Sequence, residues 1–179
     1  MAAAALLLAG CSALPATPAA PAPAAPAAPS AECIVGNWSL DVVDYETQSV
    51  SYVATLDAPL EFFSLTGVQN LAVSEDGQFL LQTDISTSVT IAIDGYERIY
   101  ETHTVGFSTA EWTPGETGTI ALADWVDTLE VTGDAPEESG LGGGVGFGAI
   151  PIVNMTCEGD NLTLSGLDLP LDSHWTRQN

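Results

Sequence analysis

Apolar and polar residues alternate along most of the chain after residue 31, which is the spacing of β-strands with one buried face. In 35–43, Gly36, Trp38, Leu40 and Val42 share one face of the predicted strand. Short runs of the same kind recur between turn residues, a pattern typical of an antiparallel barrel or sandwich. The strands predicted in this way cover 35–43, 69–74, 78–84, 88–94, 96–105, 107–112, 119–123, 125–132, 148–155, 161–164 and 173–177.

Asp-Gly pairs separate two of these strand pairs. Asp76 and Gly77 lie between apolar runs, and Asp94 and Gly95 lie between the next two. Asp-Gly between alternating apolar residues is a strong signal for a tight hairpin turn. The chain therefore predicts hairpins around residues 76–77 and 94–95.

One stretch departs from the period of two. Val50 and Val53 recur at helical spacing, and Asp44 is a good residue for a helix N-cap. We predict a helix over 45–56, capped by Asp44. Phe62 and Phe63 are expected to form a second short turn that covers the same opening.

The two ends of this region resemble the lipocalin and fatty-acid-binding-protein superfamily, the calycins. Gly36-Asn37-Trp38 is similar to the Gly-x-Trp of their first strand, and Trp175-Thr176-Arg177 is similar to their last strand. The resemblance implies an all-β fold, an antiparallel up-and-down β-barrel with a short helical lid after the first strand. It also implies that Arg177 stacks over Trp38 and closes the barrel floor. A surface ion pair of Arg177 is the alternative, and the last strand lacks the carboxylate clamp of the fatty-acid-binding branch.

The N-terminus contains the features of an exported lipoprotein. Residues 2–10 are apolar but far shorter than the about 20 residues that span a bilayer. Leu8-Ala9-Gly10-Cys11 resembles the lipobox of bacterial lipoproteins, which implies lipidation of Cys11. We expect a signal peptide over 1–10, a Pro/Ala-rich tether over 11–30, and a barrel domain over 31–179. The protein would then be anchored by lipid to the bacterial cell membrane and face the extracytoplasmic side; an incidental cysteine in an Ala-rich tail is the alternative.

Two cysteines remain once Cys11 is assigned, Cys33 and Cys157. An exported protein meets an oxidising environment, where an even number of cysteines indicates a disulfide. We therefore predict a bond between Cys33 and Cys157, with two buried thiols as the alternative.

The charge of the chain excludes several classes of function. It has 24 acidic residues against 2 basic ones, a net charge of −22, and it has no lysine. Binding of nucleic acid by a basic patch is therefore excluded and docking of the folded part onto anionic lipid is disfavoured, so contact with the membrane is expected through the lipid anchor only. We find no catalytic motif, no cofactor motif and no set of metal ligands, and we expect a monomer that is not an enzyme.

The expected ligand is a small apolar or amphipathic molecule bound between the lid and the barrel interior. Tyr96, Arg98 and Tyr100 alternate along one predicted strand, so one face would present a guanidinium between two phenols. Phe62 and Phe63 would lie beside the opening. The alternative is a structural or protein-interaction module, such as an inhibitor, whose barrel is filled by side chains.

Overall fold

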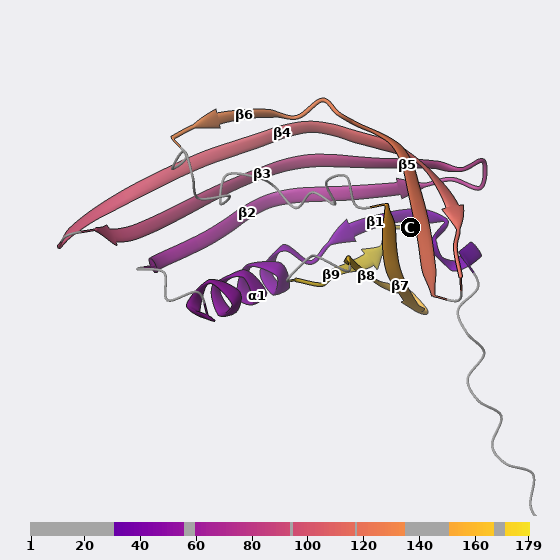
Figure 1. Ribbon diagram of the computed structural model, residues 1–179, viewed down its shortest axis with the longest axis horizontal. Helices are drawn as coiled ribbons and strands as arrows, with labels where there is room; N and C mark the ends of the chain where they lie inside the picture. Colours follow the sequence, from indigo (N-terminus) through magenta and orange to yellow (C-terminus); the bar gives the residue numbers. More distant parts are fainter. Residues whose placement is uncertain (1–30, 56–59, 94, 117, 135–150, 167–170) are drawn as a thin grey trace, which may run out of the picture.

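The computed structural model describes residues 31–55, 60–93, 95–116, 118–134, 151–166 and 171–179. It is mostly β-structure, with one α-helix after the first strand (Figure 1). The elements are η1 (Ala31–Ile34), β1 (Gly36–Leu40), α1 (Val42–Thr55), β2 (Leu60–Val73), β3 (Gln78–Ile93), β4 (Tyr96–Pro114), β5 (Thr119–Asp127), β6 (Glu130–Gly133), β7 (Ile152–Glu158), β8 (Asn161–Gly166) and β9 (Ser173–Arg177).

The strands form one closed antiparallel sheet. Hydrogen bonds lead from β1 through β2, β3, β4, β5, β7, β8 and β9, and β9 pairs again with β1. The eight strands follow one another as a meander, while β6 pairs with β4 outside this ring. The predicted all-β fold with up-and-down antiparallel strands and a helix after the first is therefore confirmed.

Three strands are much longer than predicted. The runs 78–84 and 88–94 belong to the single strand β3, because Ile85, Ser86 and Thr87 between them continue the alternation of buried and exposed side chains. Gly106 does not divide β4 into two strands. Its φ is +140°, and a Cβ there would meet the carbonyl oxygen of Thr128. The glycine therefore permits the backbone at Thr128 to lie close to β4 while β4 remains continuous.

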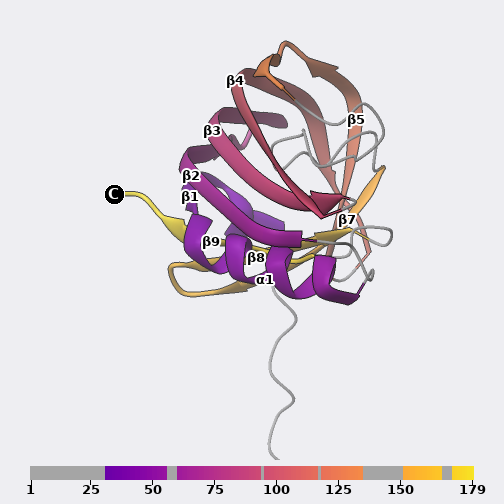
Figure 2. The ribbon, with the colours of Figure 1, turned by 90° about the vertical axis from the view of Figure 1, so that its left-hand side faces the viewer.

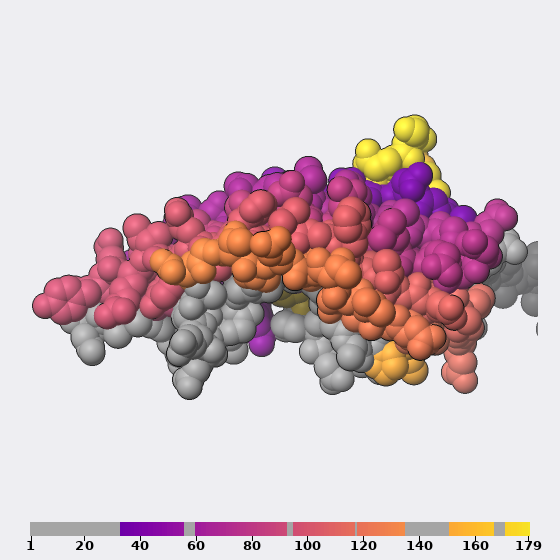
Figure 3. Space-filling view, turned by 90° about the horizontal axis from the view of Figure 1, so that it is seen from above, coloured from indigo at the N-terminus to yellow at the C-terminus, as the bar shows by residue number. Residues whose placement is uncertain are grey.

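These long strands reach past the ring. β1 pairs only with Asn70–Val73 of β2, and β5 pairs only with the end of β4 that follows Phe107. Residues 60–69 of β2, 83–93 of β3 and 96–106 of β4, together with β6, form a four-stranded sheet that we call the extension. It runs to the left in Figure 1, and Figure 3 shows its strands side by side from above, with β6 in orange.

The eight-stranded ring itself, which we call the closed end, contains the hydrophobic core. Its inward side chains are almost all apolar and include three tryptophans. The buried members are Ile34, Trp38, Leu40, Leu71, Val73, Phe79, Leu81, Ala110, Trp112, Ile120, Leu122, Val153, Met155, Leu162, Leu164 and Trp175.

Arg177 covers this core at Trp38, as the sequence predicted. Its guanidinium carbon lies 4.1 Å from the centroid of the Trp38 ring. Nη1 donates to the carbonyl of Val35 at 2.9 Å and Nη2 to that of Cys33 at 3.0 Å. Nε also lies 3.8 Å from a carboxylate oxygen of the exposed Asp160, a weaker contact than the stack. A Cβ at residue 36 would collide with the guanidinium, which explains the glycine of the Gly-x-Trp sequence.

The predicted disulfide is also present. Cys33, in the 3-10 helix η1, bonds to Cys157 of β7 across 124 residues of sequence, and both cysteines pack against the core. The bond therefore joins the start of the described chain to the late part of the ring.

The helix begins earlier than predicted. Asp41, not Asp44, caps it, because the Asp41 carboxylate accepts the N–H of Asp44 at 3.0 Å. The helix runs over Val42–Thr55, and Leu56 of the predicted range lies outside the described residues. Phe62 and Phe63 lie in β2, so the predicted second turn is wrong. Figure 2 shows α1 along the edge of β2. No helix among the described residues is long and apolar enough to cross a membrane.

Candidate functional site

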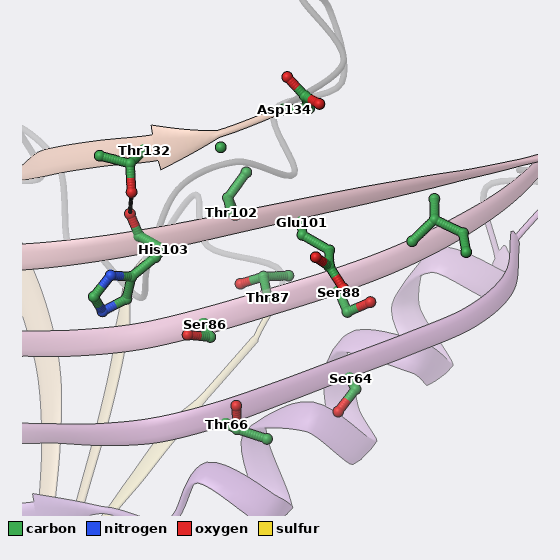
Figure 4. A pocket seen from close by; sticks show the side chains of 12 residues that line it. Ser64, Thr66, Ser86, Thr87, Ser88, Glu101, Thr102, His103, Thr132 and Asp134 are labelled. Atoms are coloured by element: carbon green, nitrogen blue, oxygen red, sulfur yellow. Dashed lines mark hydrogen bonds between the residues drawn. The ribbon is translucent and has the colours of Figure 1, made fainter.

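An open groove of about 830 Å³ lies on the outer face of the extension (Figure 4). All four strands of the extension contribute to it, and most of its lining side chains are polar. The lining residues are Ser64, Thr66, Ser86, Thr87, Ser88, Ile99, Glu101, Thr102, His103, Thr132, Gly133 and Asp134, of which Thr87 and Thr102 are buried and direct their side chains to the inner face.

The strand register arranges the groove floor in rows. Thr66 pairs with Ser86, Ser86 with His103, and His103 with Thr132, so one row crosses four strands. The next row contains Ser64, Ser88 and Glu101, paired in the same way. Neighbouring strands lie about 4.8 Å apart, and residues i and i+2 of one strand about 6.7 Å apart. The floor is therefore a regular grid of short polar side chains.

Four hydroxyls of this grid form no hydrogen bond within the part of the chain that the structure describes. Among the described residues, no hydrogen bond involves the side chains of Ser64, Thr66, Ser86 or Ser88. The Thr132 hydroxyl makes only a long contact, donating to the carbonyl of His103 at 3.5 Å. The four free hydroxyls remain available to water or to a ligand.

His103 is held in place by a carboxylate. Its Nε2 lies 2.8 Å from Oδ1 of Asp84, the outward residue of β3 next to Ser86. The pair thus fixes the ring at one side of the grid.

The charged groups of the groove are acidic. Glu101 and Asp134 line it, and the N–H of Asp134 donates to the carbonyl of Glu101 at 2.9 Å, which ties the end of β6 to β4. Neither arginine of the chain lines the groove. An anionic ligand would therefore meet repulsion without a compensating cation.

One end of the groove is apolar. Ile99 lines it with 65% of its surface exposed, and Phe62 is 54% exposed. The register aligns Phe62, Thr90 and Ile99 in the row that follows Ser64, Ser88 and Glu101. The outer face thus changes from polar to apolar along the strands.

The residues expected to bind a ligand do not form one site. Tyr96, Arg98 and Tyr100 share the inner side of β4 by alternation, and Phe63 is in the cross-strand row of Tyr100. Phe62 points to the opposite side, because adjacent residues of a strand alternate between the two faces and Phe62 is in register with Thr90 of the outer face. Tyr96 and Arg98 are exposed near the hairpin end.

The inner face of the extension is more polar than the alternation around Val89 suggested. Its buried side chains include several hydroxyls that continue the strands of the apolar core. They are Thr83, Thr87, Thr102, Thr104 and, at the border with the closed end, Ser108.

The helix α1 is attached to the ring by polar contacts. The Glu46 carboxylate accepts a hydrogen bond from the N–H of Leu65 at 2.7 Å. It thus takes the place of the carbonyl that a neighbouring strand would provide at this edge of β2. Asp44 lies 2.7 Å from Nδ1 of His174 and accepts from Gln48 at 2.6 Å. Partial burial acts to raise the pKa of Asp44, but the hydrogen bonds from His174 and Gln48 and the charge of His174 hold it below its ordinary 3.8. Burial raises the pKa of Tyr45, which packs against the core.

Other predicted features lie elsewhere. Cys11, the signal peptide and the tether are outside the described residues. Within the described part of the chain, no group of three or more His, Cys, Asp or Glu side chains could hold a metal ion.

Sequence reasoning missed the groove itself. The alternating hydroxyls at 64 and 66 and at 86 and 88 were its signal, but they gain meaning only when the strands are aligned. No protein-family model, curated protein or solved structure matches this chain.

Proposed function

We propose that this protein is a binding module, tethered to the cell envelope, that takes a small amphipathic molecule in the outer groove of the extension. The observation that carries the proposal is the groove itself. Its 830 Å³ is within the range of small-molecule sites, and it has a polar grid at one end and Ile99 at the other, with the exposed Phe62 outside the lining but in the same cross-strand row as Ile99. Such a gradient suits a ligand with a polar head and an apolar tail.

The cellular location rests on two supports. The Cys33–Cys157 disulfide is typical of proteins outside the reducing cytoplasm. The lipobox-like Leu8-Ala9-Gly10-Cys11 and the following Pro/Ala segment suit a lipid anchor and a spacer. Kinship with the calycins is supported by the stacking of Arg177 over Trp38 in a closed ring of strands.

The groove is preferred to the helix-covered interior as the binding site. The interior site relied on Phe62 and Arg98 facing the same space, whereas they are on opposite faces of the extension. Ser86 lies opposite His103, but no hydrogen bond joins a serine hydroxyl of the grid to His103 among the described residues, so we propose binding without catalysis.

The proposal is tested by filling the groove. The full-length chain with Cys11→Ser, which removes the acylation site, permits work without detergent. We expect the neutral fluorescent probe N-phenyl-1-naphthylamine to bind with a Kd of about 1–10 µM, equivalent to roughly −7 to −8 kcal/mol. Ser86→Leu should weaken binding at least tenfold, because its side chain occupies the centre of the grid.

Gln82→Leu is the matched control. Gln82 is on the outer face of the same strand but does not line the groove, so its variant should bind normally. Equal loss in both variants, or no binding by the parent protein, would refute the proposal.

A second function, docking of a protein, is favoured by one separate observation. Leu80, Phe107 and Val126 are exposed near one another on the outer face of the closed end, and Leu80 and Val126 both pair with Thr109. Apolar side chains gathered in this way mark contact surfaces. A photo-crosslinking residue at position 107 should capture a discrete envelope protein in intact cells if this surface is used, and none if it is not.

A further inference from the structure

We infer that the groove recognises an uncharged polyhydroxylated headgroup, a sugar or another polyol, with the apolar part of the ligand directed towards Ile99 and Phe62. This inference deepens the proposed function and depends on it. It assigns the chemical class of the headgroup and its orientation on the extension.

The first argument is the hydrogen-bonding capacity of the floor. A Ser or Thr hydroxyl both donates and accepts, and four such groups on two adjacent rows have no partner among the described residues (Figure 4). A trimethylammonium group neither donates nor accepts a hydrogen bond, and a sulfate ester can only accept. A polyol presents both functions on each of its oxygens, so it can use the whole grid.

The second argument is charge. Glu101 and Asp134 are acceptors for ligand hydroxyls, but they repel anions, and the net charge of −22 adds to this at long range. Both carboxylates belong to exposed residues. Exposed ion pairs contribute little because solvent screens them, so a cationic headgroup would gain less there than a polyol gains across the hydroxyl rows.

The third argument is orientation. The row of Phe62, Thr90 and Ile99 follows the Ser64 row along the strands, away from the row of Thr66 and His103. A ligand tail placed over Ile99 and Phe62 removes apolar surface from water while the head stays on the grid. The reverse orientation would place the tail over hydroxyls and Glu101.

The test uses amphiphiles that share one alkyl chain. Octyl glucoside, octyltrimethylammonium and octyl sulfate, each below its micelle concentration, compete with N-phenyl-1-naphthylamine for the full-length Cys11→Ser protein. We expect octyl glucoside to bind at least tenfold more tightly than either of the others.

Isosteric variants then locate the recognition. Thr66→Val and Ser86→Ala each remove one hydroxyl, and each should weaken octyl glucoside about three- to tenfold while the affinity for octyltrimethylammonium stays unchanged. Glu101→Gln keeps hydrogen-bonding capacity but removes a charge, and it should keep glucoside binding within about threefold. Gln82→Ala, outside the groove, should bind as the parent does.

The outcomes separate the two levels of the proposal. Equal affinity for the three headgroups would overturn the inference but leave amphiphile binding in place. Tightest binding of octyltrimethylammonium that is lost in Glu101→Gln would replace the polyol site with a cation site. Failure of all three amphiphiles and of the probe to bind would overturn the proposed function as well.

Discussion

Strands β2, β3 and β4 run through both the closed end and the extension, yet their inner faces differ between the two regions. In the closed end β2, β3 and β4 contribute Leu71, Leu81 and Trp112 to the apolar core. In the extension, β3 also buries Thr83 and β4 buries Thr104, beside the apolar Leu65, Ile85 and Val89. The change from an apolar inner face to a mixed one occurs within continuous strands and not at a domain boundary.

The difference separates stability from binding. Apolar burial contributes about 25 cal/mol per Å², so the core with its three buried tryptophans and the disulfide supplies most of the stability. Buried hydroxyls contribute much less in net terms, since folding replaces their hydrogen bonds to water. The extension buries fewer apolar side chains, among them Leu65, Ile85 and Val89, and it is continuous with the closed end through β2, β3 and β4, while its outer face carries the polar groove.

The largest expected effect comes from opening the disulfide at the closed end. The double substitution Cys33→Ser and Cys157→Ser removes a cross-link that spans 124 residues, and it should lower the free energy of unfolding by about 4 kcal/mol. Urea denaturation measures it, with reductant as the control: reductant should shift the parent protein to the midpoint of the variant and leave the variant unchanged. An unchanged midpoint would mean that the core holds the closed end without the cross-link.

A smaller effect is expected from Arg177→Met. The substitution keeps the aliphatic stem but removes the cation over Trp38 and the donors to the carbonyls of Val35 and Cys33. The loss should be about 2 kcal/mol, and Arg177→Lys should recover only part of it. Tryptophan fluorescence during denaturation reports it. A change below about 0.5 kcal/mol would show that the stack does not contribute to closure.

The smallest effect is expected where α1 joins the ring. Asp44→Asn should cost less than about 1 kcal/mol at pH 5, because both partners of the Asp44–His174 pair are partly exposed. The pKa of Asp44 is below its ordinary 3.8, so its carboxylate stabilises the fold above that pH and loses this effect as pH falls below it. The difference from the parent should therefore shrink in acid.

Asp124→Asn is the control for this variant. Asp124 is exposed, has φ of +53°, which asparagine tolerates, and forms no ion pair with any described residue. Its stability should match that of the parent at every pH. If Asp44→Asn lowers the stability as much as Arg177→Met does, the attachment of the helix contributes as much to the fold as the Arg177 stack of the closed end, contrary to this prediction.

The sequence by itself determined the features that depend on local patterns. The period of two predicted an all-β fold, Asp76 and Gly77 predicted a hairpin, and the last strand was predicted over its full range. The cysteine count predicted the disulfide, and the resemblance at Gly36, Trp38 and Arg177 predicted the stack. In each case a short sequence pattern is enough to predict the feature: an apolar face, a tight turn, a pair of oxidised cysteines, or a cation over an indole.

Only the tertiary structure decided the rest. The joining of 78–84 and 88–94 into one strand depends on partners on both sides, and the edge of β2 is closed by Glu46 from a helix that propensity alone predicts poorly. The groove depends on register, which brings Thr66, Ser86, His103 and Thr132 into one row although they span 67 positions of the numbering, from 66 to 132. Hydrophobic alternation specifies which face of each strand is buried. It does not specify which residues of neighbouring strands lie opposite one another, and that alignment creates the site.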